Sequence, residues 1–348
     1  MINIGIIGLG FMGATHLKSY RKVPNARIAA ICDANGRHLD GDFSDVAGNL
    51  PGQEPLKLDM VGVKASSDIN DLLTDPDLQL IDICTPTPQH HPLVLAALQA
   101  GKHVICEKPF ARTSEQAREM VAAAAIAGRF LMPAMCLRFW PEWAWIKRAI
   151  DEQTYGKALA ARFRRVAQAP GWGTYLQGED SGGALLDLHI HDVDFIQHCF
   201  GQPTSVFATG YSILSGAMDH VVTQYQFKSG LIAHAEGGWT MAEGFGFNMA
   251  CTVNFETATA DYDLARGADS LKLFEKGKEP RTVKCEGEDG FVGELTHIVN
   301  AVETGRPPSV VTAADGLRAV EICEAEERSI QTGQVVSLSQ ESLRRNNP

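Results

Sequence analysis

The sequence lacks three features that would assign the chain to a membrane, a nucleic acid or an oxidising compartment. No apolar run in its 348 residues approaches the roughly 20 residues of a membrane-spanning helix. Its net charge is −11, with no run of basic residues, which argues against nucleic acid as a partner. Its eight cysteines form no C-x-x-C pair, so we expect free thiols in a reducing compartment. An apolar run begins at residue 2 and leaves no room for a signal peptide, so we expect a cytoplasmic protein.

The first candidate binding feature is a glycine-rich turn between a strand and a helix. Apolar residues 4–7 predict a buried strand, and Gly8, Gly10 and Gly13 follow it in a G-x-G-x-x-G pattern. Such glycines permit a tight turn, the approach of a pyrophosphate and close packing of the next helix. Asp33 ends the next predicted strand about 20 residues after Gly13, the spacing at which a carboxylate meets the adenosine ribose. We interpret these features as a dinucleotide site, and the alternative is a turn that binds nothing.

Strands and helices alternate through the first part of the chain. Predicted strands cover 4–7, 27–32, 79–84, 103–106 and 130–135, and predicted helices cover 14–20, 91–100 and 114–127. A short helix is also expected within 37–50. This alternation predicts a parallel sheet covered by helices. Ligands bind beyond the carboxyl ends of such strands, where Asp33, Thr85 and Lys108 fall.

The hydrophobic period changes in the second part of the chain. Helices are predicted over 141–151 and 185–199, strands over 158–166, 204–213, 219–227, 231–240, 245–255, 258–264, 271–275 and 281–284, and closing helices near 291–304 and 312–331. Many short strands at this spacing indicate a mostly antiparallel sheet. The expected fold is an N-terminal Rossmann dinucleotide-binding domain over 1–136. An α+β domain with a large open, mostly antiparallel sheet follows over 137–348.

Three spaced motifs make the chain resemble the Gfo/Idh/MocA oxidoreductase family, named for glucose–fructose oxidoreductase and inositol dehydrogenase. They are T-P-x-x-x-H at Thr85, Pro86 and His90, A-G-K-H-V at 100–104, and E-K-P at 107–109. The resemblance runs over nearly the whole chain. It implies that Lys108 hydrogen-bonds the reacting oxygen and that the Lys108–Pro109 bond is cis. Without the resemblance, Lys108 could be an ordinary solvated lysine.

The predicted cofactor contacts combine the glycine turn, the strand ends and the positions that the resemblance implies. They are Gly8, Gly10, Phe11, Met12, Gly13, Asp33, Thr85, Pro86, His90, Glu107 and Lys108. For His90, a structural role on the cofactor side is as plausible as a catalytic one.

A candidate catalytic pair lies in the predicted helix over 185–199. Asp187 and His191 are four residues apart and share one face of that helix. A carboxylate beside an imidazole raises the basicity of the ring, which suits a general base that takes a proton from an alcohol. On the residues alone, a polar helix face with a buried acid–histidine pair is the commoner explanation. The family's second motif, G-G-x-x-x-D-x-G-x-H-x-x-D, is matched in register by Gly182, Gly183, Asp187, His191 and Asp194. The resemblance implies that His191 is the acid/base and that Asp187 binds substrate and holds the charge pattern of the site.

His189 stands where that motif usually has glycine. It raises the alternative of a metal site made of Asp187, His189, His191 and Asp192. On a regular helix His189 and His191 point roughly 200° apart and cannot face one ion, so we predict no metal. We expect His189 to line the substrate pocket or to pack beneath the loop.

Two further residues are candidate substrate contacts. Guanidinium and aromatic groups often contact hydroxylated rings, so Arg138 and Trp172 could line a sugar pocket. Each could equally be a packing residue or an anchor.

These observations predict a dehydrogenase that transfers hydride between a nicotinamide cofactor and a hydroxyl-bearing carbon of a cyclic polyol or sugar. Asp33 places a carboxylate where a 2′-phosphate would sit, so NAD is expected over NADP, although Arg37 and His38 lie close by in the sequence. The resemblance implies a homodimer or homotetramer that buries the open sheet. Two alternatives remain open: a redox-neutral sugar-modifying enzyme with tightly held NAD, and a non-catalytic regulator that binds NAD(H).

Overall fold

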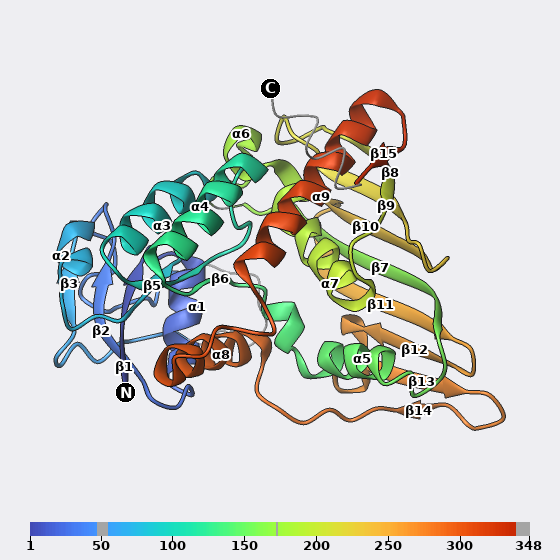
Figure 1. The fold of residues 1–348 in the computed structure, drawn as a ribbon, viewed down its shortest axis with the longest axis horizontal. Coiled ribbons are helices and arrows are strands. Elements are labelled where there is room, and N and C mark those ends of the chain that lie inside the picture. Colours follow the sequence, from blue (N-terminus) through green and yellow to red (C-terminus); the bar gives the residue numbers. More distant parts are fainter. Residues whose placement is uncertain (47–54, 172, 339–348) are drawn as a thin grey trace. The chain divides into compact units, whose positions relative to one another are not determined.

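A computed structural model describes residues 1–46, 55–171 and 173–338, and it divides into two compact units. The first unit comprises 1–139 and 288–317, and the second comprises 140–287 and 318–348. The sequence-based boundary lies between 136 and 137, and it assigns 288–317 to the second domain. Each unit is described by itself (Figure 1).

The first unit is built on a six-stranded sheet in which every neighbouring pair is parallel. Its strands are β1 (Ile2–Ile7), β2 (Ala26–Cys32), β3 (Lys64–Ser66), β4 (Leu80–Ile83), β5 (His103–Cys106) and β6 (Leu131–Pro133). The order across the sheet is β3-β2-β1-β4-β5-β6, so the direction of winding reverses between β1 and β4. The carboxyl ends of β1 and β4 border the crevice where doubly wound sheets bind their ligands.

Five helices accompany this sheet in the described residues of the first unit. They are α1 (Phe11–Tyr20), α2 (Ile69–Leu73), α3 (His90–Gln99), α4 (Ser114–Ala127) and α8 (Gly290–Thr304). Side chains cap several of them: the Thr113 hydroxyl accepts a hydrogen bond from the Gln116 N–H, and Gly128 ends α4 in the left-handed conformation. Helix α8 returns from far along the chain and packs against α1 (Figure 1).

The predicted Rossmann architecture is confirmed, with two differences in detail. The short strand β3 is absent from the prediction, because three residues without a buried run carry little signal. The helix expected within 37–50 does not form in 37–46, which fold into turns, and residues 47–50 lie outside the described residues. Glycine at 36 and 41, both at positive φ, favours turns there.

The second unit is built on a nine-stranded mixed sheet. Its strands are β7 (Ala158–Gln168), β8 (Ser205–Tyr211), β9 (His220–Gln226), β10 (Ile232–Met241), β11 (Phe247–Phe255), β12 (Ala258–Asp263), β13 (Leu271–Glu275), β14 (Arg281–Thr282) and β15 (Val336–Ser337). The order is β14-β13-β12-β11-β7-β10-β9-β8-β15. All neighbouring pairs are antiparallel except β7 and β10, which run parallel. The predicted large, mostly antiparallel sheet is therefore confirmed.

Helices cover one face of this sheet (Figure 1). They include α5 (Pro141–Asp151), α6 (Gly178–Ser181), α7 (Ile190–Phe200) and α9 (Ala313–Thr332), and a π-helical turn, Leu185–His189, leads into α7. Leu185 from the π-helical turn packs with Ala208 and Val221 of the sheet and with Ile330 of α9. Across the described residues, no helix is long and apolar enough to cross a membrane.

Candidate active site

The glycine turn of the first unit has the geometry that its sequence predicts. Gly8 has φ +93°, and a Cβ there would come within 2.7 Å of the Cys84 carbonyl oxygen. A Cβ on Gly13 would come within 2.1 Å of the Gly8 carbonyl oxygen. Gly10 faces open space, with nothing within 4 Å of the Cβ position, and no side chain caps the N-terminus of α1. This turn leaves room and main-chain N–H groups for an anion, so the residues fit a dinucleotide pyrophosphate.

Asp33 lies just beyond β2 at the same edge of the sheet. Its carboxylate is buried and accepts hydrogen bonds from three main-chain N–H groups, those of Leu9 (3.4 Å), Asn35 (3.0 Å) and Arg37 (3.3 Å). The exposed Arg37 guanidinium lies 3.6 Å from Asp33 Oδ1. The loop therefore holds the carboxylate in place beside the glycine turn, with one cation close to it.

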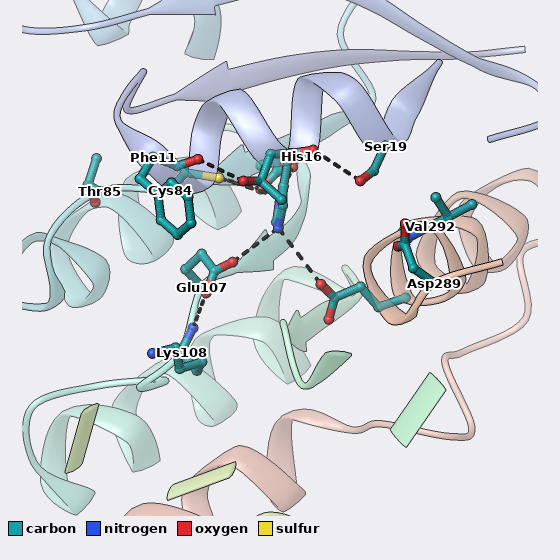
Figure 2. Close-up of polar contacts among 12 residues, drawn as sticks. Phe11, His16, Ser19, Cys84, Thr85, Glu107, Lys108, Asp289 and Val292 are labelled. Carbon is teal, nitrogen blue, oxygen red and sulfur yellow. Dashed lines mark hydrogen bonds and ion pairs between the residues drawn. The ribbon is translucent and has the colours of Figure 1, made fainter. Parts of the chain in front are cut away.

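Lys108 follows β5 at the carboxyl edge of the sheet, and the side chain of the preceding residue, Glu107, holds its main-chain N–H. The Glu107 carboxylate accepts a hydrogen bond from the Lys108 N–H at 2.9 Å, as Figure 2 shows. The Lys108–Pro109 peptide bond is cis, which confirms the prediction. Lys108 itself is half-buried.

His90 supports this arrangement from α3. Its Nδ1 lies 2.9 Å from the Pro109 carbonyl oxygen and its Nε2 lies 2.8 Å from the Thr85 carbonyl oxygen. Burial lowers the pKa of His90 more than the two carbonyls raise it. His90 thus lies between the end of β4 and the Lys108–Pro109 turn, where its neutral ring donates a hydrogen bond to one of the two carbonyl oxygens. These contacts fit the structural alternative for this residue.

The predicted catalytic helix of the second unit begins as the π-helical turn Leu185–His189 and continues as α7. Asp187 and His191 are both half-buried, whereas Asp192 and Asp194 are fully buried. The regular helix assumed from the sequence does not apply to 185–189. The structure brings Asp187 and His191 into one segment of the second unit, while the glycine turn and Lys108 belong to the first unit.

His189 is fully buried and is held by two other elements. Its Nε2 lies 3.1 Å from the Tyr225 hydroxyl of β9 and 3.3 Å from Glu326 Oε2 of α9. The Tyr225 hydroxyl donates a hydrogen bond to Glu326 Oε1 at 2.6 Å. Gly237 of β10 leaves the space that the ring needs, because a Cβ there would meet His189 Cβ at 2.6 Å. These contacts give His189 a packing role, and its predicted contact with substrate is untested.

Asp192 and Arg165 form an ion pair that the sequence analysis missed. Arg165 of β7 donates two hydrogen bonds to the Asp192 carboxylate of α7, at 3.0 and 3.1 Å. Asp192 pairs with Arg165 of β7, whereas His189 contacts residues of β9 and α9. The two side chains are therefore directed to different partners and not to one metal position. In the described part of the chain, only His16, Asp82 and Cys84 are grouped closely enough to hold a metal ion.

The remaining predicted substrate contacts have separate outcomes. The buried Arg138 donates a hydrogen bond to the Val310 carbonyl oxygen at 2.7 Å and lies 3.4 Å from Asp315 Oδ2. This anchors the segment after β6 within the first unit, and a contact of Arg138 with substrate stays a prediction. Trp172 lies outside the described residues.

Comparison with known proteins identifies the class to which this fold and these motifs belong. Residues 2–135 match the model of the oxidoreductase family with an NAD-binding Rossmann fold, and residues 143–261 match the Gfo/Idh/MocA C-terminal domain. The chain belongs to the Gfo/Idh/MocA family of NAD-binding oxidoreductases.

The relatives include named dehydrogenases and a named reductase. The chain is 26% identical to a myo-inositol 2-dehydrogenase of Thermotoga maritima over 350 residues, covering 97% of this chain and 99% of the relative. It is 35% identical to a 1,5-anhydro-D-fructose reductase of Ensifer adhaerens over 187 residues, covering 51% of this chain and 55% of the relative. Levoglucosan dehydrogenase, solved with NADH and L-sorbose, has the same fold, with a TM-score of 0.85 and 23% identity over 97% of this chain and 99% of that one.

Proposed function

We propose that this protein is an NAD-dependent dehydrogenase that oxidises a secondary hydroxyl on a cyclic polyol or sugar, or reduces the matching ketone. The observation that supports this most is the placement of Lys108. It follows β5 at the edge where the glycine turn and Asp33 also lie, with its main chain bound to Glu107. A primary amine held at the carboxyl edge of a doubly wound sheet can hydrogen-bond the oxygen of a bound substrate.

In this proposal the two units supply different groups. The first-unit turn Gly8–Gly13, with Asp33, would hold NAD, which accepts hydride from the substrate carbon. Lys108 would hydrogen-bond the reacting oxygen, and His191 would take the hydroxyl proton. Asp187 would bind a further substrate hydroxyl and balance the charge of the site. NAD is preferred to NADP because the Asp33 carboxylate would repel a 2′-phosphate.

The substrate class is tested by the change in absorbance at 340 nm. We expect turnover with at least one compound of a panel of myo-inositol, levoglucosan and 1,5-anhydro-D-fructose, in the presence of NAD⁺ or NADH. A cofactor that survives purification without turnover would instead favour the redox-neutral enzyme or the NAD(H)-binding regulator.

The proposed roles are tested by Lys108→Ala and His191→Ala. Each should lower kcat by roughly 10²–10⁴-fold, the usual effect of removing an acid–base group. The Kd for NADH, measured by fluorescence titration, should stay within a few-fold of wild type. Near-normal turnover of His191→Ala on the best substrate would refute its role as the base.

A further inference from the structure

Helix α1 carries a fully buried imidazole three residues after the last glycine of the turn. On one side of the ring, His16 Nδ1 lies 2.8 Å from Asp82 Oδ2, at the end of β4. On the other side, His16 Nε2 lies 3.0 Å from Glu107 Oε1, just after β5. The Nδ1 contact with Asp82 is a hydrogen bond, whereas the Nε2 contact with Glu107 is an ion-pair distance without a hydrogen bond. The positively charged imidazolium is the form of the ring that both carboxylates attract.

The charges in this cluster favour that state. Burial opposes a charge on His16, but the charges of Asp82 and Cys84 and their hydrogen bonds with the ring together raise the pKa of His16 well above its ordinary value. Glu294 of α8 lies 3.8 Å from His16 Nε2 and is also fully buried. Burial raises the pKa of Glu294 well above its ordinary value, so a third negative charge is avoided.

Glu107 connects this cluster to Lys108. Its Oε1 contacts the His16 ring, and its Oε2 accepts the hydrogen bond from the Lys108 N–H. Figure 2 shows His16 pointing at Glu107 and Glu107 in turn at Lys108. A single buried carboxylate therefore joins the helix that follows the glycine turn to the main chain of Lys108.

We infer that His16 is a positioning residue: it holds the Glu107 carboxylate so that Glu107 fixes the main chain of Lys108. The inference rests on the proposed role of Lys108 toward the substrate oxygen. Misplacement of a reacting group by about 1 Å can lower a rate about 100-fold. If Glu107 is no longer held in place, Lys108 should shift and kcat should fall.

A metal ion bound by His16, Asp82 and Cys84 is the competing explanation of the cluster. Their ligand atoms lie within 4.8 Å of one another. Hydrogen bonds already account for this proximity, because the Cys84 thiol donates to Asp82 Oδ1 at 3.3 Å and His16 Nδ1 is engaged by Asp82 Oδ2. Burial also raises the pKa of the Cys84 thiol, which disfavours the thiolate that a metal requires.

The test compares His16→Gln, Glu107→Gln and the double variant with wild type. His103→Gln is the matched control, because His103 lies on β5, the strand that Glu107 follows, and its Nδ1 accepts a hydrogen bond from the Phe130 N–H. We expect His16→Gln to lower kcat by about tenfold or more while the Kd for NADH stays within about threefold. Glu107→Gln should lower kcat by about threefold or more, and His103→Gln should stay within about twofold.

The double variant separates one linked chain of contacts from two independent effects. If His16 acts through Glu107, the double variant should lose no more than the larger single loss. The inference would be overturned if the fold-decreases in kcat of the two single variants multiplied in the double variant. It would also be overturned by a kcat within twofold of wild type in folded His16→Gln, or by a stoichiometric metal ion in the purified protein. If His16→Gln does not fold, Glu107→Gln decides, and a kcat within twofold of wild type then overturns the inference.

Failure of the proposed function is recognised separately. If wild type turns over no compound of the panel, the proposed function fails, and the inference is decided by labelling the Lys108 amine with pyridoxal phosphate and borohydride. The labelling rate should then change by about threefold or more in His16→Gln and not in His103→Gln. An unchanged rate would overturn the positioning role.

Discussion

Asp33 is the residue on which we expect the choice between NAD and NADP to depend. Its buried carboxylate is fixed by three main-chain N–H groups, and the Arg37 guanidinium lies beside it. Without the Asp33 carboxylate, the 2′-phosphate of NADP should no longer be repelled, and the Arg37 guanidinium should be available to pair with that phosphate. We therefore expect Asp33→Ala to lower the ratio of kcat/KM for NAD to kcat/KM for NADP by about tenfold or more, a change of about 1.4 kcal/mol.

Arg37→Ala is the matched control for that measurement. It removes the cation and keeps the carboxylate, so the preference for NAD should be retained or increased. Wild-type enzyme that prefers NADP would contradict the proposed role of Asp33, whatever the variants do.

Local signals in the sequence pointed to the candidate binding residues of the first unit. The glycines, Asp33 and Lys108 stand in short motifs whose chemistry depends on neighbours in the sequence. His16 could not be assigned in the same way, because its partner Asp82 lies 66 positions away and the pairing depends on the order of β1 and β4 in the sheet. The ion pair between Arg165 and Asp192 was missed for the same reason, since its members come from a strand and a distant helix.

At the scale of elements, the segment that carries Asp187 differs from its prediction in the kind of helix that it begins with. Spacing alone predicts a regular helix over 185–199, whereas the structure has a π-helical turn over 185–189 before α7 begins. π-Helical turns of this kind are frequent at functional sites. The contacts that hold this turn come from Tyr225 and Glu326, which no local pattern connects to it.

Replacing His189 with the glycine usual in the family should therefore destabilise the protein. The change removes a buried ring and its contacts with Tyr225 and Glu326, and it adds backbone freedom. We expect His189→Gly to lower the free energy of unfolding by about 2–4 kcal/mol in urea titrations. The kcat of the folded variant should fall less than that of His191→Ala.

His198→Gly is the control for the backbone freedom that a new glycine adds to a helix. His198 lies half-buried on α7 with its ring against that of Phe195, so this change should cost about 1–2 kcal/mol, less than His189→Gly. Equal losses for the two variants would show that the contacts of His189 contribute little.

At the scale of the whole molecule, the sequence predicted both sheets but not the path of the chain between the units. Residues 288–317 return to the first unit, where α8 packs against α1 and brings Glu294 to His16. An amphipathic pattern predicts such a helix and its buried face but not the element that covers that face. The two-residue edge strand β15 was not predicted.

The nine-stranded sheet also exposes apolar side chains, which supports the expected homo-oligomer. Phe207, Val222 and Ile232 are 38%, 42% and 58% exposed. The registers of β8 with β9 and of β9 with β10 place them on one face of the sheet. Large apolar side chains exposed on one face of an open sheet are a feature of interaction sites. We expect sedimentation to show a homodimer or homotetramer for wild type and a monomer for Val222→Glu/Ile232→Glu.

Charge introduced at the centre of such a face prevents a second copy from packing there, because a buried unpaired carboxylate is strongly unfavourable. Val61→Glu is the control, since Val61 is 88% exposed and belongs to the first unit, whereas the sheet belongs to the second. It should leave the sedimentation coefficient unchanged. A monomeric wild type, or an oligomer that persists in the double variant, would show that this face is not the interface. If the variant is monomeric, its kcat shows whether the site is complete within one chain. A kcat near that of wild type means that one chain is sufficient, and a much lower kcat means that the site requires the oligomer.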